Sequence, residues 1–379
     1  MRAFAAICAG ILLLGGLSSG CGGGGGSTVT GPPPESLAAA PTITTAAAQN
    51  GAVVATLATT TSGATIYYTL DGSTPTNASQ IYVVPFLVAS NLTVNALTAA
   101  AGYQDSTVTS QSFTPNIASG TLVWSDEFAN STGANAQPNP AIWNYDTGTD
   151  CCGNSELETY CAAGSSTSPC DPANPNAYVD TSGILHIVAR NPSAAVYTSA
   201  RMKTQGLFSF QYGRVEARMM LPESQGMWPA AWMLGVNINT TPFPACGESD
   251  IVEHIDGADT PFGGPGTGAA PGYDWTQSSI HGTGLTGGTP YTSAGFSAAA
   301  WHTYGMIWTK GQIQYYVDDP ATIYETFDAS TSAGTWPFDQ GPQFVILNLA
   351  VGGDWPGSPD NTTVFPSEIQ VDYVRIYAN

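Results

Sequence analysis

Short runs of alternating apolar and polar residues, separated by glycine and proline, constrain the fold of this chain most strongly. The alternation is clear in Arg214–Met219 and in Val371–Ile376, each with one apolar or aromatic face. A period of two is the pattern of a half-buried β-strand. The 379 residues include 43 glycines and 27 prolines, which suit many short strands joined by turns, and we find no convincing amphipathic helix. The sequence therefore predicts an all-β protein in which two sheets pack together.

The segment Gly247–His254 concentrates three acids, Glu248, Asp250 and Glu253, in a chain that is only 9% charged. In a regular strand, Glu248 and Asp250 would face one side and Glu253 the other. A β-bulge at Ile251–Val252 would return Glu253 to the face of the other two, and bulges occur beside active sites. We therefore predict three carboxylates on one face of a bulged strand.

Three neighbouring acids suit the hydrolysis of a glycosidic bond. One carboxylate attacks the anomeric carbon, and a second, kept protonated, donates to the leaving oxygen. Like charges a few ångströms apart do not all ionise easily, so Asp250 would hold a neighbour's pKa high enough for an acid near neutral pH. The pattern alone leaves alternatives open, because the same letters occur on surface helices and in calcium-binding loops.

The flanking sequence resembles the bacterial laminarinase-type members of glycoside hydrolase family 16. The matching motifs follow one another over about residues 121–379: Trp124–Phe128, Gly153–Tyr160, Tyr197–Arg201, Tyr212–Arg218, Trp228–Gly235, Ile280–Thr283, Leu347–Gly353 and Val371–Tyr377. The resemblance implies a two-sheet β-jelly-roll sandwich of the concanavalin A-like kind, a substrate cleft on its concave face and retaining chemistry. Within the family, the spacing E-x-D-x-x-E is associated with laminarinases, agarases and carrageenases, and the shorter E-x-D-x-E with lichenases and xyloglucan enzymes.

Carried over by position, Glu248 resembles the nucleophile, Asp250 the assisting acid and Glu253 the general acid/base. Ser249 departs from the apolar residue that is usual in the family, and we expect it to face away from the cleft. Further positions resemble polar and aromatic residues that bind sugar: Asn154, Glu158, Arg201, Trp228, Trp232 and His281. An indole face can pack on the apolar face of a pyranose, although a place in the sandwich core is the alternative for both tryptophans.

The resemblance also implies a calcium site away from the cleft, formed by Glu127, the Gly183 carbonyl and Asp372. Oxygen ligands suit this hard cation, which would stabilise the fold and take no part in catalysis. Salt bridges to nearby cations are the alternative for the two acids. Arg214 and Arg218 are expected to face outward as partners of Glu216, and no cofactor is expected for catalysis.

The sequence divides into four parts. Residues 1–20 resemble a signal peptide, because Arg2 precedes an apolar run that ends before Cys21. The site is similar to an imperfect lipoprotein lipobox, which predicts an exported protein that is lipid-anchored at Cys21 or otherwise secreted. A retained membrane anchor is the alternative, but the run is short for a bilayer span. Residues 21–39 form a Gly/Pro-rich tether, residues 40–115 a small accessory module and residues 121–379 the hydrolase domain.

The accessory module reads as short strands over Val53–Leu57, Thr65–Leu70 and Leu92–Leu97, with a turn at Asp71–Pro75. It resembles the small β-sandwich module at the C-terminal end of chitobiase-like enzymes. Holding the enzyme off the membrane is the favoured role. The alternative is carbohydrate binding through exposed aromatic side chains, for which the module offers Tyr67, Tyr82 and Tyr103.

Cysteine usage agrees with export. Cys151, Cys152, Cys161 and Cys170 fall within twenty residues that contain no histidine, which favours disulfides over zinc. Because adjacent cysteines rarely bond each other, we expect Cys151 and Cys152 to pair separately with Cys161 and Cys170, in either connectivity. Cys246 would then be a buried free thiol.

A formal net charge of −20 limits the partners of this chain. The acidic surface repels polyanions, so nucleic acid and sulfated galactans fit poorly and a neutral β-glucan fits better. Together with the family resemblance, which implies the activity, this predicts a monomeric endo-β-1,3-glucanase that acts on laminarin-like glucans. The alternatives are a hydrolase of the same fold acting on agarose or mixed-linkage glucan, a transglycosylase, and a non-catalytic glucan-binding protein. The last would be expected to lack one of the carboxylates, and all three are present.

Overall fold

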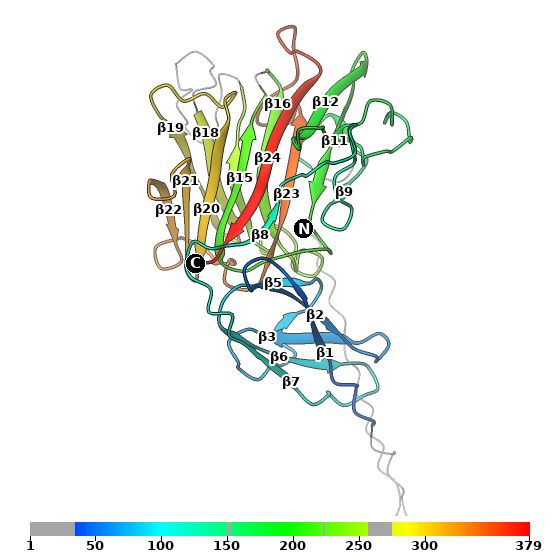
Figure 1. The fold of residues 1–379 in the computed structure, drawn as a ribbon, viewed down its shortest axis with the longest axis vertical. Helices are drawn as coiled ribbons and strands as arrows, with labels where there is room; N and C mark the ends of the chain where they lie inside the picture. The colour runs from blue at the N-terminus through cyan, green and yellow to red at the C-terminus, as the bar shows by residue number, and fades with distance from the viewer. Residues whose placement is uncertain (1–34, 150–152, 223, 257–274) are drawn as a thin grey trace, which may run out of the picture.

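The computed structural model describes residues 35–149, 153–222, 224–256 and 275–379 (Figure 1). Within these ranges every regular element is a β-strand, as the alternation predicted. The predicted signal peptide and most of the predicted tether lie outside the described residues, as do Cys21, Cys151 and Cys152. The described part of the chain contains no helix of the length and apolar character required to cross a membrane.

Two large sheets form the C-terminal domain (Figure 1). The strands of the first sheet are β8 (Leu122–Asp126), β10 (Glu158–Tyr160), β11 (Ala177–Val179), β12 (Leu185–Ser193), β13 (Val196–Ser199), β15 (Gly213–Met220), β20 (His302–Thr309), β21 (Gln312–Val317), β22 (Ile323–Asp328) and β24 (Ser367–Tyr377). Their order is β10-β13-β12-β24-β15-β20-β21-β22, with β8 paired to β24 and β11 paired to β12.

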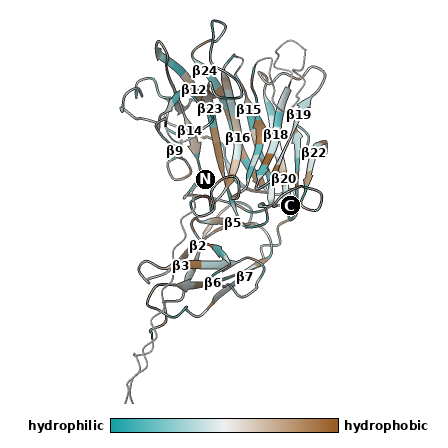
Figure 2. Cartoon of the chain, turned by 180° about the vertical axis from the view of Figure 1, so that it is seen from behind, coloured by the Kyte–Doolittle hydropathy of each residue, from teal (hydrophilic) through white to brown (hydrophobic). Residues whose placement is uncertain are grey.

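The second sheet carries the acidic motif. Its strands are β9 (Asn144–Asp146), β14 (Arg201–Lys203), β16 (Met227–Gly235), β17 (Glu248–Glu253), β18 (Trp275–Gly282), β19 (Leu285–Thr292) and β23 (Gln343–Val351). They lie in the order β19-β18-β17-β16-β23-β14-β9. The central strand β23 is buried along its whole length, and Figure 2 shows apolar colouring along it.

The apolar faces of the two sheets meet in one core. Val215, Ala217 and Met219 on β15 are at most 2% exposed, and they pack with Ala231 and Met233 on β16 in the same cluster. The two runs that show the clearest alternation form parts of β15 and β24, which are antiparallel neighbours. This arrangement is the two-sheet jelly-roll sandwich that the resemblance implied.

The N-terminal module has two small sheets and a core of its own. One sheet contains β1 (Thr42–Ala47), β2 (Val53–Ala58) and β5 (Phe86–Val88), and the other contains β3 (Thr65–Thr69), β4 (Gln80–Ile81), β6 (Leu92–Ala99) and β7 (Thr109–Phe113). The three predicted strands are present as β2, β3 and β6. Tyr82 is half-buried against Tyr68 and Phe86, so it belongs to the module's core; Tyr103, in contrast, is 44% exposed.

The module is docked directly on the C-terminal domain, below its strands in Figure 1. The backbone N–H of Leu87 donates to the Ser209 carbonyl at 2.9 Å, and the Ser209 hydroxyl donates to the Pro85 carbonyl at 3.0 Å. Leu87 is also part of the main core, and Val84 packs with Leu234 in a smaller cluster. Shared apolar contacts and hydrogen bonds therefore fix the module against the C-terminal domain.

The disulfide pairing differs from the prediction. Cys161 and Cys170 bond to each other, with their Cα atoms 5.8 Å apart. Two successive turns, in which Ser165 N–H donates to the Ala162 carbonyl and Cys170 N–H donates to the Thr167 carbonyl, bring the chain back on itself. The expectation that each of these cysteines pairs with one of the adjacent Cys151 and Cys152 is therefore wrong. Cys246 is free and buried, as predicted.

Candidate active site

A β-bulge in β17 places the three acids on one face. Opposite them in β16, Trp232 pairs with Asp250 and Ala231 pairs with Val252, so Ile251 is an extra residue in β17. The predicted bulge is thus confirmed. Beyond it, Glu253 pairs with Ala230, whereas Glu248 pairs with Leu234. The β16 partners of the three acids, Ala230, Trp232 and Leu234, are two residues apart and therefore share one face of the sheet. The three acids opposite them share that face too.

The acids are joined by short polar contacts. His281 Nε2 lies 3.3 Å from Asp250 Oδ2 and 3.8 Å from Glu248 Oε1. The ligand atoms of these three side chains all lie within 4.8 Å of one another. Glu253 accepts a hydrogen bond from the indole N–H of Trp228, with 3.0 Å between Nε1 and Oε1. His281 therefore contacts the first two acids, while Trp228 holds the third.

The electrostatics of the cluster favour the protonated forms of both glutamates and of the histidine. Burial, followed by the Asp250 charge, raises the pKa of Glu253 to about 8. The same two causes raise the pKa of Glu248, but the nearby His281 opposes them and favours the ionised form. Burial alone would lower the pKa of His281; its hydrogen bond and charge interaction with Asp250 outweigh burial and raise this pKa to about 9. A pKa of about 8 keeps Glu253 protonated near neutral pH, as an acid requires, whereas His281 gives Glu248 a cationic neighbour that favours its carboxylate form.

Ser279 links two acids and was missed by the sequence analysis. Its hydroxyl oxygen lies 2.6 Å from Asp250 Oδ2 and 3.1 Å from Glu253 Oε2. The single hydroxyl proton can be donated to either carboxylate, and donation to Glu253 favours the ionised form of that acid. Because Ser279 lies two residues before His281 in β18, the period of two would have placed both on one face.

Replacement of Ser279 by alanine is expected to lower kcat about tenfold, since a hydrogen bond to a charged group is lost. The hydroxyl lowers the pKa of Glu253, so its removal should raise that pKa and move the alkaline limb of the pH–rate profile to higher pH. The matched control is Ser278→Ala, which removes a hydroxyl bonded to the Ile251 carbonyl and not to an acid. An unmoved alkaline limb in Ser279→Ala would contradict the assignment.

Trp228 and Trp232 lie on the same strand face as the acids, whereas Ala231 and Met233 supply the core. Trp228 contacts Glu253 as described. The indole N–H of Trp232 donates to Asn348 Oδ1 at 2.7 Å, and the Arg201 guanidinium lies 4.6 Å from the ring centroid. The structure therefore places both tryptophans and Arg201 on the sheet face that carries the three acids. Asn348 lies there too, and the sequence analysis did not single it out.

The two polar positions in the Gly153–Tyr160 motif have different surroundings. Glu158 is 2% exposed and accepts the backbone N–H of Val351 at 2.7 Å; burial, then Glu156, raises its pKa to about 8. Its carboxyl thus supports the neighbouring strand, which does not fit direct contact with sugar. Asn154 is exposed, and its side-chain Nδ2 lies 3.4 Å from Glu156 Oε1. Of the two acids in this motif, Glu156 and not Glu158 is therefore the neighbour of Asn154.

The two acids predicted to bind calcium are each paired with an arginine. Arg375 makes two hydrogen bonds to Glu127, at 2.9 and 2.8 Å. Arg218 lies 2.7 Å from Asp372, so its predicted pairing with Glu216 is wrong; β15 and β24 are neighbours, which brings Arg218 to Asp372. Arg214 does pair with Glu216, as expected. These two pairs favour the salt-bridge alternative for Glu127 and Asp372, and the calcium site stays a prediction.

A thermal-unfolding experiment would test this interpretation. We expect the same Tm in excess calcium and in a chelator, because Arg375 and Arg218 already neutralise Glu127 and Asp372. A calcium-dependent rise in Tm that Asp372→Asn removes would restore the calcium site.

A β-sandwich whose sheet face carries three linked carboxylates beside tryptophans is the site of a glycoside hydrolase. Residues 171–375 match the model of the glycosyl hydrolases family 16. The chain belongs to this family. Residues 44–110 match the chitobiase/beta-hexosaminidase C-terminal domain, in agreement with the resemblance seen in the module.

Similar proteins share the C-terminal domain. A beta-glucanase of Rhodothermus marinus is 36% identical over 267 residues, which are 68% of this chain and 84% of the relative. A glucan endo-1,3-beta-glucosidase A1 of Niallia circulans is 32% identical, over 69% of this chain and 38% of the relative. The laminarinase catalytic domain of Thermotoga maritima superposes with a TM-score of 0.55 at 34% identity, covering 68% of this chain and 98% of that domain.

Proposed function

We propose that this protein is an endo-β-1,3-glucanase that hydrolyses laminarin-like glucans by double displacement with retention. The observation that carries the proposal is the bulge in β17, which puts Glu248 and Glu253 on one face but in different surroundings. Glu248 lies near the His281 imidazolium, whereas Glu253 is held by Trp228 and Ser279. The relatives named as glucanases and laminarinases support the choice of substrate.

In the first step, the Glu248 carboxylate attacks the anomeric carbon while the bond to the leaving oxygen breaks. Glu253 transfers its proton to that oxygen, which leaves a glycosyl ester on Glu248 and a carboxylate on Glu253. In the second step, Glu253 takes a proton from water, whose oxygen attacks the anomeric carbon and releases Glu248. Asp250, bonded to His281 and Ser279, would hold the proton distribution through both steps.

The substrate would lie across the acidic face. We propose that Trp228 and Trp232 support the sugar rings there, and that Asn154, Arg201 and His281 hydrogen-bond their hydroxyls. Glu158 is left out of this set because it is buried and bonded to Val351. An overall charge of −20 supports a neutral polymer over a sulfated one.

Reducing-end release from laminarin, lichenan, agarose and κ-carrageenan by the mature protein tests this function. We expect laminarin to be cleaved preferentially, with shorter oligosaccharides as products. Activity confined to a galactan would keep the mechanism and overturn the substrate. Products longer than the starting oligosaccharides would indicate a transglycosylase, and binding without cleavage would indicate a glucan-binding protein.

We further propose, from the sequence alone, that the chain is exported and lipid-anchored at Cys21. We expect the full-length protein to incorporate a labelled fatty acid and to sediment with membranes in a bacterial host. Cys21→Ser should abolish the label and release the protein into the soluble exported fraction. Equal labelling of the full-length protein and of its Cys21→Ser variant would rule out Cys21 as the lipidation site.

A further inference from the structure

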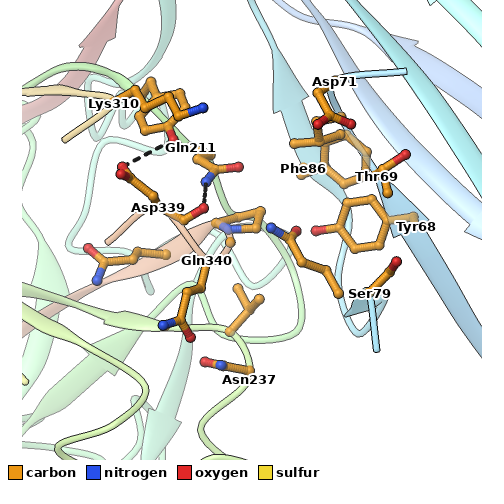
Figure 3. Close-up of a pocket in the computed structure, with 18 of the residues that line it drawn as sticks. Tyr68, Thr69, Asp71, Ser79, Phe86, Gln211, Asn237, Lys310, Asp339 and Gln340 are labelled. Carbon is orange, nitrogen blue, oxygen red and sulfur yellow. Dashed lines mark hydrogen bonds between the residues drawn. The ribbon is translucent and has the colours of Figure 1, made fainter. Parts of the chain in front are cut away.

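An open cavity lies between the N-terminal module and the C-terminal domain (Figure 3). Its volume is about 790 Å³, which is in the range of ligand-binding pockets. The module contributes Tyr68 and Gln80 to its wall, and the C-terminal domain contributes Gln211, Asn237 and Gln340. Neither part of the chain forms this cavity by itself.

The walls suit a neutral ligand that is rich in hydroxyl groups. Amide side chains on both sides can donate and accept hydrogen bonds, as sugar hydroxyls do. In Figure 3, the Tyr68 hydroxyl points from the module toward the amides of the opposite wall. The charged side chains of the wall are Asp71, Lys310 and Asp339, so the wall has no positive excess that would attract a polyanion.

One polar atom of the wall lacks a hydrogen-bond partner within the described part of the chain. Gln80 Oε1 is buried and unpaired. The Gln80 side chain extends toward the C-terminal domain, where a Cβ atom added to Gly341 would lie 3.5 Å from this oxygen. A buried acceptor without a donor costs free energy, so a rotation of the Gln80 side chain that turns this oxygen toward a ligand hydroxyl in the cavity would be favourable.

The cavity adjoins the strands of the active site. Two of its wall residues are Gly235, the last residue of β16, and Cys246, which precedes the start of β17 at Glu248 by two positions. A sugar chain in the cavity would therefore lie at the ends of the two strands that carry Trp232 and Glu248.

We propose that this cavity is a second binding site for a neutral β-glucan segment, formed jointly by the module and the hydrolase domain. The identity of the sugar rests on the proposed function. The module then takes part in holding the polymer, and its role exceeds that of a spacer. Because one long chain can occupy both sites, the cavity would strengthen binding of laminarin far more than binding of short oligosaccharides.

The test uses the mature two-domain chain with Glu248→Gln, which prevents turnover, and measures affinity for laminarin and for a short laminari-oligosaccharide. Gln340→Trp in this background fills the cavity from an exposed wall position. We expect its affinity for laminarin to fall at least about tenfold, with little change for the short ligand. The matched control Gln104→Trp, exposed on the module outside the cavity wall, should bind laminarin like the parent.

Crystals of the Glu248→Gln chain soaked with the oligosaccharide give an independent reading, in which we expect sugar density in the cavity. Water alone in the cavity, together with unchanged laminarin affinity of Gln340→Trp, would overturn the second site. Cleavage of laminarin by the chain with intact Glu248 separates the two proposals. If laminarin is cleaved while Gln340→Trp binds normally, the second site fails and the glucanase stands; if laminarin is neither cleaved nor bound, both fail.

Discussion

Glu248→Gln is expected to abolish laminarin hydrolysis, with a loss of at least about 10³-fold in kcat. The amide cannot form the glycosyl ester, so the first step is blocked whatever the leaving group. An aryl β-glucoside with a good leaving group should therefore not be cleaved either. The measurement is reducing-end release together with release of the aryl alcohol. In the parent chain, a 2-fluoro glycosyl fluoride should trap the intermediate, and mass spectrometry should find the adduct on Glu248.

The variant should remain folded. Burial and the Asp250 charge raise the pKa of Glu248, so its ionised form is less favourable in the folded chain than in the unfolded chain. A neutral amide removes that cost at pH 7, and Tm should not fall. The matched control is Glu368→Gln on the ten-stranded sheet, where the acid contacts His186. That variant should keep its activity. Equal losses in both variants, or an adduct on another residue, would contradict the assignment of the nucleophile.

Glu253→Gln is expected to lower kcat on laminarin by about 10²- to 10⁴-fold, the range for loss of a positioned general acid/base. Its pattern should differ from that of Glu248→Gln. An aryl glucoside with a good leaving group needs no proton, so its first cleavage should proceed and the glycosyl-enzyme should accumulate. Added azide, which attacks the ester without help from a base, should restore turnover and give a glycosyl azide of retained β configuration.

The pH profile of the parent chain gives a second reading of Glu253. The pKa of its carboxyl is raised to about 8, and the protonated form is the one that donates to the leaving oxygen. Activity should therefore fall as pH rises through about 8, and this limb should be absent from the slow reaction of Glu253→Gln with the aryl substrate. An inverted product in the azide reaction, or an unaltered alkaline limb, would refute the double-displacement roles.

Much of the fold and the acidic cluster could be predicted from local patterns. The period of two in Arg214–Met219 and Val371–Ile376 identified β15 and β24, because one buried face requires apolar residues at every second position. The spacing of Glu248, Asp250 and Glu253 predicted the bulge at Ile251, since without an extra residue the last acid would point into the core. Both inferences depend on neighbours along one strand.

Contacts between distant strands were harder to predict. Ser279 reaches Asp250 because β17 and β18 pair in one register, and Arg218 reaches Asp372 because β15 and β24 do. A different register would change both partners. Glu158 looked like a sugar ligand by position, but its carboxyl bonds the Val351 backbone of β23. These contacts depend on which strands pair and in which register, and the residues of one strand alone do not reveal either.

The sequence by itself determined the all-β class, the bulged carboxylate strand and the glycoside hydrolase family, because period, spacing and motif order are local properties of the chain. Only the tertiary structure decided the Cys161–Cys170 pairing, the hydrogen bonds of Ser279 and the docking of the module through Leu87 and Ser209. Each of these depends on side chains that meet across turns or sheets, and on how two folded units fit against each other. The cavity between those units exists only after both have packed.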